Sequence, residues 1–281
     1  MLKKIIFWCE FPEQVDWVYL NRLLTKLKLH VEIYIAAGSK KEFEGIKRKI
    51  KCKYIETSVW PILSKEGGYW FSGFSDKKDI DRLKQFKDYK IKIDLEPPLP
   101  KWTYKNHRII FYALKQMFRK GENNEYLKKT IYNLAKTNKV ETVVNQMQII
   151  ANEFPLARWY LERQGMYVDI KKNITKNIMC YTSFAGIFFR LFLRMYMGYY
   201  MKKTVERYNG NVMFSIGLIG PGILKNEKIY RNIEEFGQDL NMVNESGASK
   251  VAIYSIEGLL KRDKPEEWLK LVKNYLQCMK D

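Results

Sequence analysis

The chain is poor in the residues on which many metal and nucleophilic sites depend. It has 281 residues but only two histidines, His30 and His107, and four cysteines that lie far apart, none of them in a CxxC pair. Neither histidine follows a predicted strand, which argues against a histidine-ligated zinc enzyme and against Ser-His-Asp catalysis. The cysteine spacing also lacks the pattern of a disulfide framework, so we expect a reducing, cytoplasmic environment.

Long apolar runs are scarce as well. Only the segment from Ile178 to Met201 approaches the length of a membrane span, and it contains Arg190 and Arg194. Charged side chains are costly in the middle of a bilayer. We therefore interpret the segment as a buried strand followed by an amphipathic helix, and we predict no transmembrane segment.

Acidic residues are outnumbered by basic ones. The chain has 31 Asp and Glu against 50 Lys and Arg, which gives a formal net charge of +19. A charge of this size suits a polyanionic partner such as nucleic acid or anionic lipid. However, the sequence has no basic arm, and its longest basic clusters are the short runs 47–51 and 202–203. Lysines scattered over solvated helix faces explain the charge equally well, so a nucleic-acid partner stays open without being favoured.

The chain does contain a regular alternation of two patterns. Apolar, β-branched runs at 4–9, 31–36, 52–57, 90–95, 148–151, 177–181, 212–218 and 251–255 predict strands, and helical patterns separate them. Strands and helices in this number and order indicate a (β/α)8 TIM-type barrel, with a doubly wound sheet as the alternative. We predict a single barrel domain over 1–281 that carries a helical insertion, 104–145, after the fourth strand.

Carboxylates recur where the predicted strands end. These residues are Glu10, Glu56, Asp94, Glu96, Glu153 and Glu257. Parallel strands of a barrel end at one face, where active sites lie, so acids from distant parts of the chain are expected to converge there. Convergent carboxylates serve acid–base catalysis or bind hard cations.

The order of strands in a barrel predicts which acids are neighbours. The first and last strands are adjacent, so Glu10 and Glu257 are expected to be close. Asp94 and Glu96 point to the same side of their strand, and their repulsion would raise the pKa of one of them, as a general acid needs. For Glu10 and Glu153 the competing interpretation is that each caps the helix after its Phe-Pro pair.

Aromatic side chains and glycines add candidate binding residues. The long loop after the third predicted strand is rich in aromatic residues and glycine, and it suits either stacking on a sugar ring or packing on itself. The predicted substrate-binding residues are Glu56, Trp60, Tyr69, Trp70, Glu153 and Tyr254. The glycine-rich segment 217–222, after the seventh strand, suits either a phosphate site or a tight turn.

One strand end resembles a known family. Asp94-Leu95-Glu96 is similar to the end of the Asp-x-x-Asp-x-Asp-x-Glu signature of chitinase-like glycoside hydrolases, although Tyr89 and Lys92 hold its two earlier acidic positions. The resemblance covers this strand only. It implies that Glu96 protonates the leaving oxygen and that Asp94 orients the substrate's own nucleophile. A barrel glycosidase of another lineage, with Glu257 or Glu10 as base or nucleophile, fits the same residues.

Three functions follow from these patterns. The first is a cofactor-free hydrolase acting on a glycosidic or related bond in a small molecule or oligosaccharide, with Glu96 as general acid. The second is a barrel isomerase, lyase or phosphoesterase that holds Mg²⁺ or Mn²⁺ with Glu10, Asp94, Glu96 and Glu257. The third is a non-enzymatic protein that binds nucleic acid or anionic lipid through a basic surface. The sequence leaves the oligomeric state open.

Overall fold

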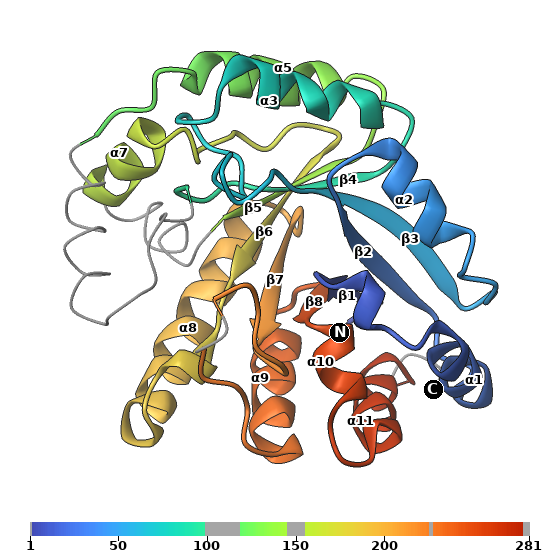
Figure 1. The fold of residues 1–281 in the computed structure, drawn as a ribbon. Helices are drawn as coiled ribbons and strands as arrows, with labels where there is room; N and C mark the ends of the chain where they lie inside the picture. The colour runs from blue at the N-terminus through green and yellow to red at the C-terminus, as the bar shows by residue number, and fades with distance from the viewer. Residues whose placement is uncertain (1, 99–118, 145–154, 225–226, 278–281) are drawn as a thin grey trace. The chain divides into compact units, whose positions relative to one another are not determined.

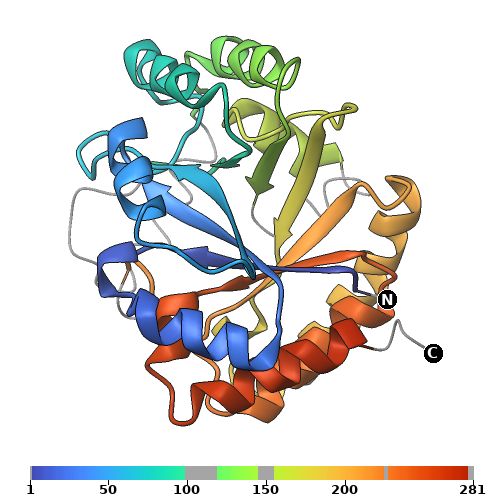
Figure 2. The same ribbon diagram turned by 90° about the vertical axis from the view of Figure 1, so that its right-hand side faces the viewer.

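The protein forms a closed barrel of eight parallel strands (Figures 1 and 2). The computed structural model describes residues 2–98, 119–144, 155–224 and 227–277. In barrel order, which is also chain order, the strands are β1 Lys4–Cys9, β2 Val31–Ala37, β3 Ile55–Pro61, β4 Ile91–Asp94, β5 Val140–Val144, β6 Ile174–Met179, β7 Val212–Gly217 and β8 Lys250–Tyr254. The predicted (β/α)8 barrel is confirmed, and the doubly wound alternative is wrong.

Helices follow the strands along the chain. The α-helices are α1 Trp17–Leu27, α2 Lys40–Lys47, α3 Lys77–Asp81, α5 Asn124–Leu134, α7 Pro155–Arg163, α8 Ile187–Arg207, α9 Ile233–Glu245, α10 Ile256–Leu260 and α11 Pro265–Gln277. Short 3₁₀ helices occur at η1 Pro12–Gln14, η2 Arg82–Phe86 and η3 Thr182–Phe184. None of the described helices combines the length and the apolar character that crossing a bilayer requires.

The chain divides into two compact units. The first comprises residues 1–36, 41–58 and 177–281, and the second comprises residues 37–40 and 59–176. The first unit therefore holds β1, β2, β7 and β8, whereas β4 and β5 belong to the second. The candidate residues of each unit are described separately below.

The fifth strand differs from its predicted position. We predicted it at 148–151, which lies outside the described residues, and assigned 104–145 to a helical insertion. The structure forms β5 from Val140–Val144, which pairs in parallel with β4 through Ile91↔Val140 and Asp94↔Val143. Its polar residues Glu141 and Thr142 are buried, so the segment lacked the apolar run expected of a barrel strand. Residues 104–118 lie outside the described part, and the extent of an insertion there stays a prediction.

The strands of the first unit place a continuous apolar surface on one face of the sheet. Residues paired in register point to the same side of a sheet, and successive residues alternate. One face of β7, β8 and β1 is formed by the buried residues Phe214, Ile216, Val251, Ile253, Ile5 and Phe7. This is the face that the helices of a barrel cover. Trp8 and Tyr254, paired in register, lie on the opposite, interior face.

The N-terminal ends of β1 and β2 hold an ion pair between a buried carboxylate and a half-buried lysine, which the sequence analysis did not identify. The carboxylate of Glu32 is fully buried and lies 2.6 Å from the ammonium of Lys4. The hydroxyl of Ser58 donates to the same carboxylate at 2.5 Å. The Glu32 charge is therefore neutralised by a cation and also hydrogen-bonded, as a buried carboxylate requires.

Candidate functional site

The end of β8 leads directly into a short helix that positions Glu257. Ser255 is the N-cap of α10, and its hydroxyl accepts a hydrogen bond from the N–H of Gly258 at 3.3 Å. Glu257 therefore lies in the first helical turn and not at the end of a strand, where we had placed it. Its Oε1 accepts from the N–H groups of Glu10 at 3.0 Å and Phe11 at 3.4 Å. The structure thus brings Glu257 to the end of β1.

The carboxylate of Glu10 is held by the two neighbouring strands. Trp8 and Tyr254 are paired in register, and their rings meet edge to face with centroids 5.5 Å apart. Glu10 follows two residues after Trp8, which places it within reach of the Tyr254 hydroxyl. That hydroxyl and the N–H of Ile223, at 3.0 Å, both donate to Oε2 of Glu10. Glu10 thus binds two donors that lie outside the helix that follows it, and its capping of that helix stays a prediction.

A third carboxylate approaches from the loop after β7. Oε2 of Glu227 accepts from the N–H of Gly222 at 2.7 Å. A Cβ at position 222 would lie 2.9 Å from Oε2 of Glu227 and 3.0 Å from Oε2 of Glu10, and it would clash with the Tyr254 hydroxyl. Only glycine permits this close approach. Because carboxylates occupy the N–H groups of Gly222 and Ile223, these amides are not available to a phosphate, and the tight-turn interpretation is favoured.

Burial and like charge change the proton affinity of this cluster. Burial, together with the charge of Glu10, raises the pKa of Glu257 to about 7, although hydrogen bonds to the carboxylate oppose the shift. Burial also holds the pKa of Tyr254 well above its usual value, with Glu10 and Glu257 adding to the effect. Burial raises the pKa of Glu227 as well, against the hydrogen bond from Gly222. Glu257, Tyr254 and Glu227 therefore keep their protons to higher pH than usual.

One carboxyl oxygen of Glu257 is buried without a hydrogen-bond partner among the described residues. Oε2 is buried, and no residue in the described part of the chain forms a hydrogen bond with it. Because Oε1 accepts two backbone N–H groups, a proton on this carboxyl resides on Oε2. Buried polar atoms without a hydrogen-bond partner are uncommon in folded proteins.

In the second unit the predicted acid Asp94 is buried beside a lysine rather than beside another acid. The Asp94 carboxylate lies 3.2 and 3.3 Å from the ammonium of Lys92, which also sits 3.4 Å from the centroid of the Trp60 ring. Burial raises the pKa of Asp94, and Lys92 opposes the shift. Repulsion from Glu96, which we expected to raise the pKa of one of the two acids, is not among the causes of the Asp94 shift. The Lys92 side chain lies two residues before Asp94, on the same side of β4.

The remaining candidates of the second unit lie in and after β3 and β4. Glu96 is half-buried and lies two residues beyond the end of β4, where its N–H donates to the carbonyl of Phe71 at 3.1 Å. Trp60 and Tyr69 are buried, and the rings of Tyr69 and Trp70 meet edge to face at 5.5 Å. The loop thus packs partly on itself. Its predicted role in substrate binding stays a prediction.

Two predicted residues do not belong to a described site. Glu56 is the second residue of β3 rather than lying at its end, because the strand begins at Ile55 and not at Cys52 as predicted. It is exposed and pairs with Lys4 at 2.6 Å, at the N-terminal end of the strands. Glu153 lies outside the described residues. Within the described ranges, no three His, Cys, Asp or Glu side chains are grouped so as to hold a metal ion.

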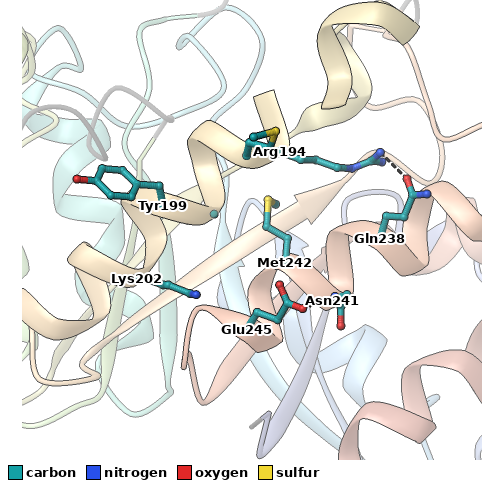
Figure 3. Close-up of a pocket in the computed structure, with 9 residues that line it drawn as sticks. Arg194, Tyr199, Lys202, Gln238, Asn241, Met242 and Glu245 are labelled. Atoms are coloured by element: carbon teal, nitrogen blue, oxygen red, sulfur yellow. Dashed lines mark hydrogen bonds between the residues drawn. The ribbon is translucent and has the colours of Figure 1, made fainter. Parts of the chain in front are cut away.

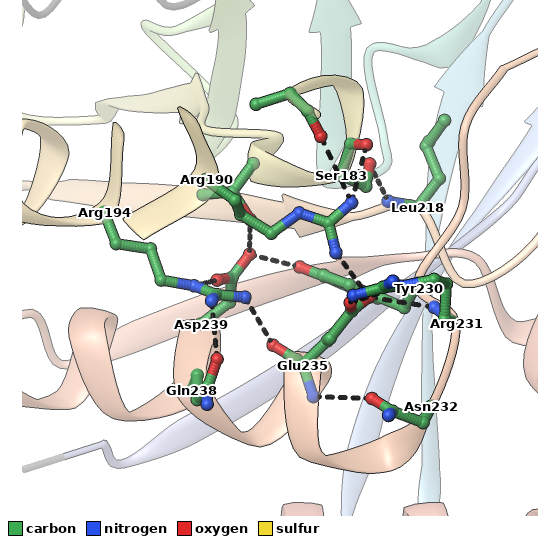
Figure 4. A network of polar contacts seen from close by, with 12 residues as sticks. Ser183, Arg190, Arg194, Leu218, Tyr230, Arg231, Asn232, Glu235, Gln238 and Asp239 are labelled. Carbon is green, nitrogen blue, oxygen red and sulfur yellow. Dashed lines mark hydrogen bonds and ion pairs between the residues drawn. The ribbon is translucent and has the colours of Figure 1, made fainter. Parts of the chain in front are cut away.

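A separate polar network joins α8 and α9 (Figure 4). Asp239 is fully buried and accepts hydrogen bonds from Thr182 and Tyr230, both at 2.6 Å, and from Arg194 at 2.6 Å. Arg190 on α8 forms an ion pair with Glu235, which lies on α9 as Asp239 does. The members of the network pair with one another, so it fixes the two helices and the loop that contains Tyr230 rather than forming an open site.

Sequence reasoning missed Glu227 and the contact of Ile223 with Glu10, and it named Tyr254 only as a substrate-binding residue. Glu227 lies in an irregular loop, where no periodicity marks a residue, and only the folded chain brings it to Gly222. A usable signal was present at α10, because Ser255 is a residue type favoured at helix N-caps and the acid Glu257 follows where a first turn would lie. That signal would have moved Glu257 from a strand end to a helix start.

Comparison with known proteins shows similarity at the level of fold. No family model matches the chain, and no curated protein matches it. The glycoside hydrolase domain of PgaB (BpsB) from Bordetella bronchiseptica is similar over 95% of this chain and 98% of that one, with a TM-score of 0.59 and 9% identity. A proposed sugar phosphate isomerase/epimerase from Anabaena variabilis is similar over 99% of both chains, with a TM-score of 0.51 and 10% identity. At these identities the similarity supports the barrel fold alone.

Proposed function

We propose that this chain is an enzyme that cleaves or rearranges a glycosidic or related bond, with Glu257 as its general acid. The observation that carries the proposal is the state of the Glu257 carboxyl, whose pKa is raised to about 7, so that it retains a proton near neutral pH. The N–H groups of Glu10 and Phe11 fix its orientation and leave the proton on Oε2. A protonated, oriented carboxyl is what the departure of an alkoxide requires.

Glu10 is the complementary group in this proposal. Its Oε2 is held by the Tyr254 hydroxyl and the Ile223 N–H, two donors that stabilise negative charge on the carboxylate. In hydrolysis the proton of Glu257 moves to the leaving oxygen, and that oxygen takes the electrons of the broken C–O bond. Glu10 then either accepts a proton from the attacking water or attacks the carbon itself before water releases the product.

Two observations support a sugar as the substrate. Aromatic rings commonly line ligand sites, and the ring centroids of Trp8 and Tyr181 lie 5.5 and 6.3 Å from that of Tyr254, beside the two acids. The glycoside hydrolase domain of PgaB also shares the barrel fold. Fold is a weak guide to function, so the acids carry the proposal and the fold only agrees with it.

Glu96 keeps its predicted role as a competing general acid. The two acids can be separated because a poor leaving group needs a proton from the enzyme and a good one does not. Phenyl glycosides and 2,4-dinitrophenyl glycosides of the same sugars form such a pair. The variants to compare are Glu257→Gln and Glu96→Gln, with the exposed Glu245→Gln on α9 as the matched control.

The proposal predicts a loss that depends on the leaving group. Glu257→Gln should lower kcat/KM for phenyl glycosides by about 10² to 10⁴ and leave the dinitrophenyl substrates nearly unaffected. Glu245→Gln should match the wild type on both. If Glu96→Gln shows the selective loss and Glu257→Gln does not, Glu96 is the acid. If no glycoside of the panel is turned over by the wild type, the glycosidic part of the proposal fails.

A further inference from the structure

In the first half of α8, the exposed residues among those whose side chains are described are all apolar or aromatic. Its exposed residues are Phe189, Leu191, Phe192, Met195, Tyr196 and Tyr199, and Phe189 and Phe192 are each 76% exposed. Monomeric proteins seldom expose a contiguous apolar surface of this kind unless it binds something. We call these six residues the apolar face of α8. An apolar stripe along a helix normally packs against another surface.

The charged residues of this half are turned inward. Arg190 is buried against Glu235, and Arg194 donates to Asp239 at 2.6 Å, so both belong to the polar network between α8 and α9 (Figure 4). The two arginines that made the segment from Ile178 to Met201 look unlike a membrane helix therefore do not interrupt the apolar face.

The exposed side chains on the outer side of α8 change from apolar to charged along the helix. Phe189 and Phe192 come first, Tyr196 and Tyr199 follow, and the exposed charged residues begin with Lys202 and Lys203. From Phe189 to Lys203 the helix rises about 21 Å. Figure 3 shows the transition, where Tyr199 and Lys202 border a groove of about 490 Å³ between α8 and α9. This order, from hydrocarbon through tyrosine to lysine, matches the order of layers that a lipid surface presents.

We infer that the apolar face of α8 docks onto an anionic lipid surface. The helix would enter the interface at a tilt, with its phenylalanines deepest among the acyl chains and its lysines at the phosphates. The net charge of +19 decides between the two candidate occupants. A second copy of the chain would bring two strongly positive molecules together, whereas an anionic bilayer attracts both the charge and the apolar side chains.

The apolar half of α8 is also the half nearest to the candidate site in the first unit. The Tyr181 ring lies 5.8 Å from the half-exposed Phe184 and 6.3 Å from Tyr254, whose hydroxyl binds Glu10. Docking through this half would bring the C-terminal ends of β7 and β8 toward the lipid surface. The inference itself is independent of the proposed chemistry, since it rests on α8 alone.

The test is sedimentation of the full chain with vesicles, either of neutral phosphatidylcholine alone or with added anionic phosphatidylglycerol. The wild type should bind the anionic vesicles at least about tenfold more tightly, and added salt should weaken that binding. Phe189→Ser with Phe192→Ser should lower binding at least about tenfold. Lys202→Gln with Lys203→Gln should lower it several-fold.

Matched controls keep the result interpretable. Val18→Ser removes another exposed apolar side chain, 70% exposed on α1, and should leave vesicle binding unchanged. Thermal melts of the phenylalanine variant should match the wild type, because both side chains are exposed. Equal binding to neutral and anionic vesicles, or no binding to either, would overturn the inference. So would a lipid-free dimer that the phenylalanine substitutions dissociate, since a second copy would then cover the face.

Discussion

The two ends of β1 each lie beside a buried carboxylate, but the charges next to these two carboxylates have opposite signs. At the N-terminal end, Glu32 is fully buried and is matched by the ammonium of Lys4 and the hydroxyl of Ser58. At the C-terminal end, Glu257 is buried beside Glu10, another carboxylate, and no cation is among the groups that shift its pKa. Burial is similar at the two ends, so the sign of the neighbouring charge makes the difference.

This difference separates a structural acid from one suited to chemistry. A carboxylate paired with lysine is held in its charged form and fixes the strands around it. A carboxylate beside another carboxylate keeps a proton to higher pH and can donate it. In barrels the N-terminal face serves stability and the C-terminal face carries the active site. The four predictions below test whether the two ends of β1 follow this division.

The largest expected effect is at the N-terminal end. Lys4→Met removes the ammonium that neutralises Glu32 and should lower the free energy of unfolding by about 3 kcal/mol in urea titrations. The matched control is Glu56→Gln, which removes the exposed second partner of Lys4 and should cost less than about 1 kcal/mol. Adding Glu32→Gln to Lys4→Met should recover part of the loss. Equal losses for Lys4→Met and Glu56→Gln would contradict a structural ion pair.

The second effect is a pH dependence at the C-terminal end. The folded pKa of Glu257 is about 7, against an ordinary 4.5. Below pH 4.5 both states are protonated, and the full contribution is present. Between about 4.5 and 7 the unfolded chain releases the proton while the folded chain keeps it, so the wild type loses about 3 kcal/mol of stability.

The measurement is the free energy of unfolding from pH 4 to pH 8. Glu257→Gln does not titrate, so its stability relative to the wild type should rise over this window by about 3 kcal/mol. The exposed control Glu245→Gln should track the wild type at every pH. A constant difference between Glu257→Gln and the wild type would show that Glu257 has an ordinary pKa.

The third prediction concerns the close approach of Gly222. Gly222→Ala places a methyl group against the Tyr254 hydroxyl and the carboxylates of Glu10 and Glu227, and it should destabilise the fold by about 2 kcal/mol. Gly45→Ala is the control, because a Cβ there meets no atom within 4 Å. Equal thermal stability of the two variants would mean that the loop can move away, and that the cluster is less tightly packed than described.

The smallest expected effect comes from a hydroxyl. Tyr254→Phe removes the donor to Glu10 and should cost about 1.5 kcal/mol in unfolding free energy. Tyr230→Phe removes a similar hydroxyl, which donates to the buried Asp239, and should cost a comparable amount. Only Tyr254→Phe should also alter the pH dependence of glycoside cleavage. If both variants alter it, the effect is one of stability and not of the site.

Much of the fold was predictable because local pattern and barrel geometry agree. The apolar runs of β1, β2, β7 and β8 are buried strands, and the neighbouring positions of the first and last strands brought Glu10 to Glu257 as expected. The fifth strand was not predictable from its own residues. Val140–Val144 contains the buried Glu141 and Thr142, and it becomes a strand through pairing with β4, a contact that the local sequence does not encode.

The environment of each acid was less predictable than its position. Asp94 looked like a helper of Glu96, but the lysine two residues before it supplies its partner. Period-two alternation places Lys92 on the same side of β4, so this pairing was open to prediction. By contrast, the contact of Glu227 with Gly222 and that of Ile223 with Glu10 depend on the path of an irregular loop.

The proton affinity of Glu257 is the central claim, and an NMR titration measures it directly. The protein is labelled with ¹³C at the glutamate carboxyls, and Glu257→Gln assigns the resonance of interest by its absence. The account predicts that this resonance titrates with a midpoint near pH 7. A midpoint near 4.5, the ordinary value, would remove the basis for assigning Glu257 as the general acid.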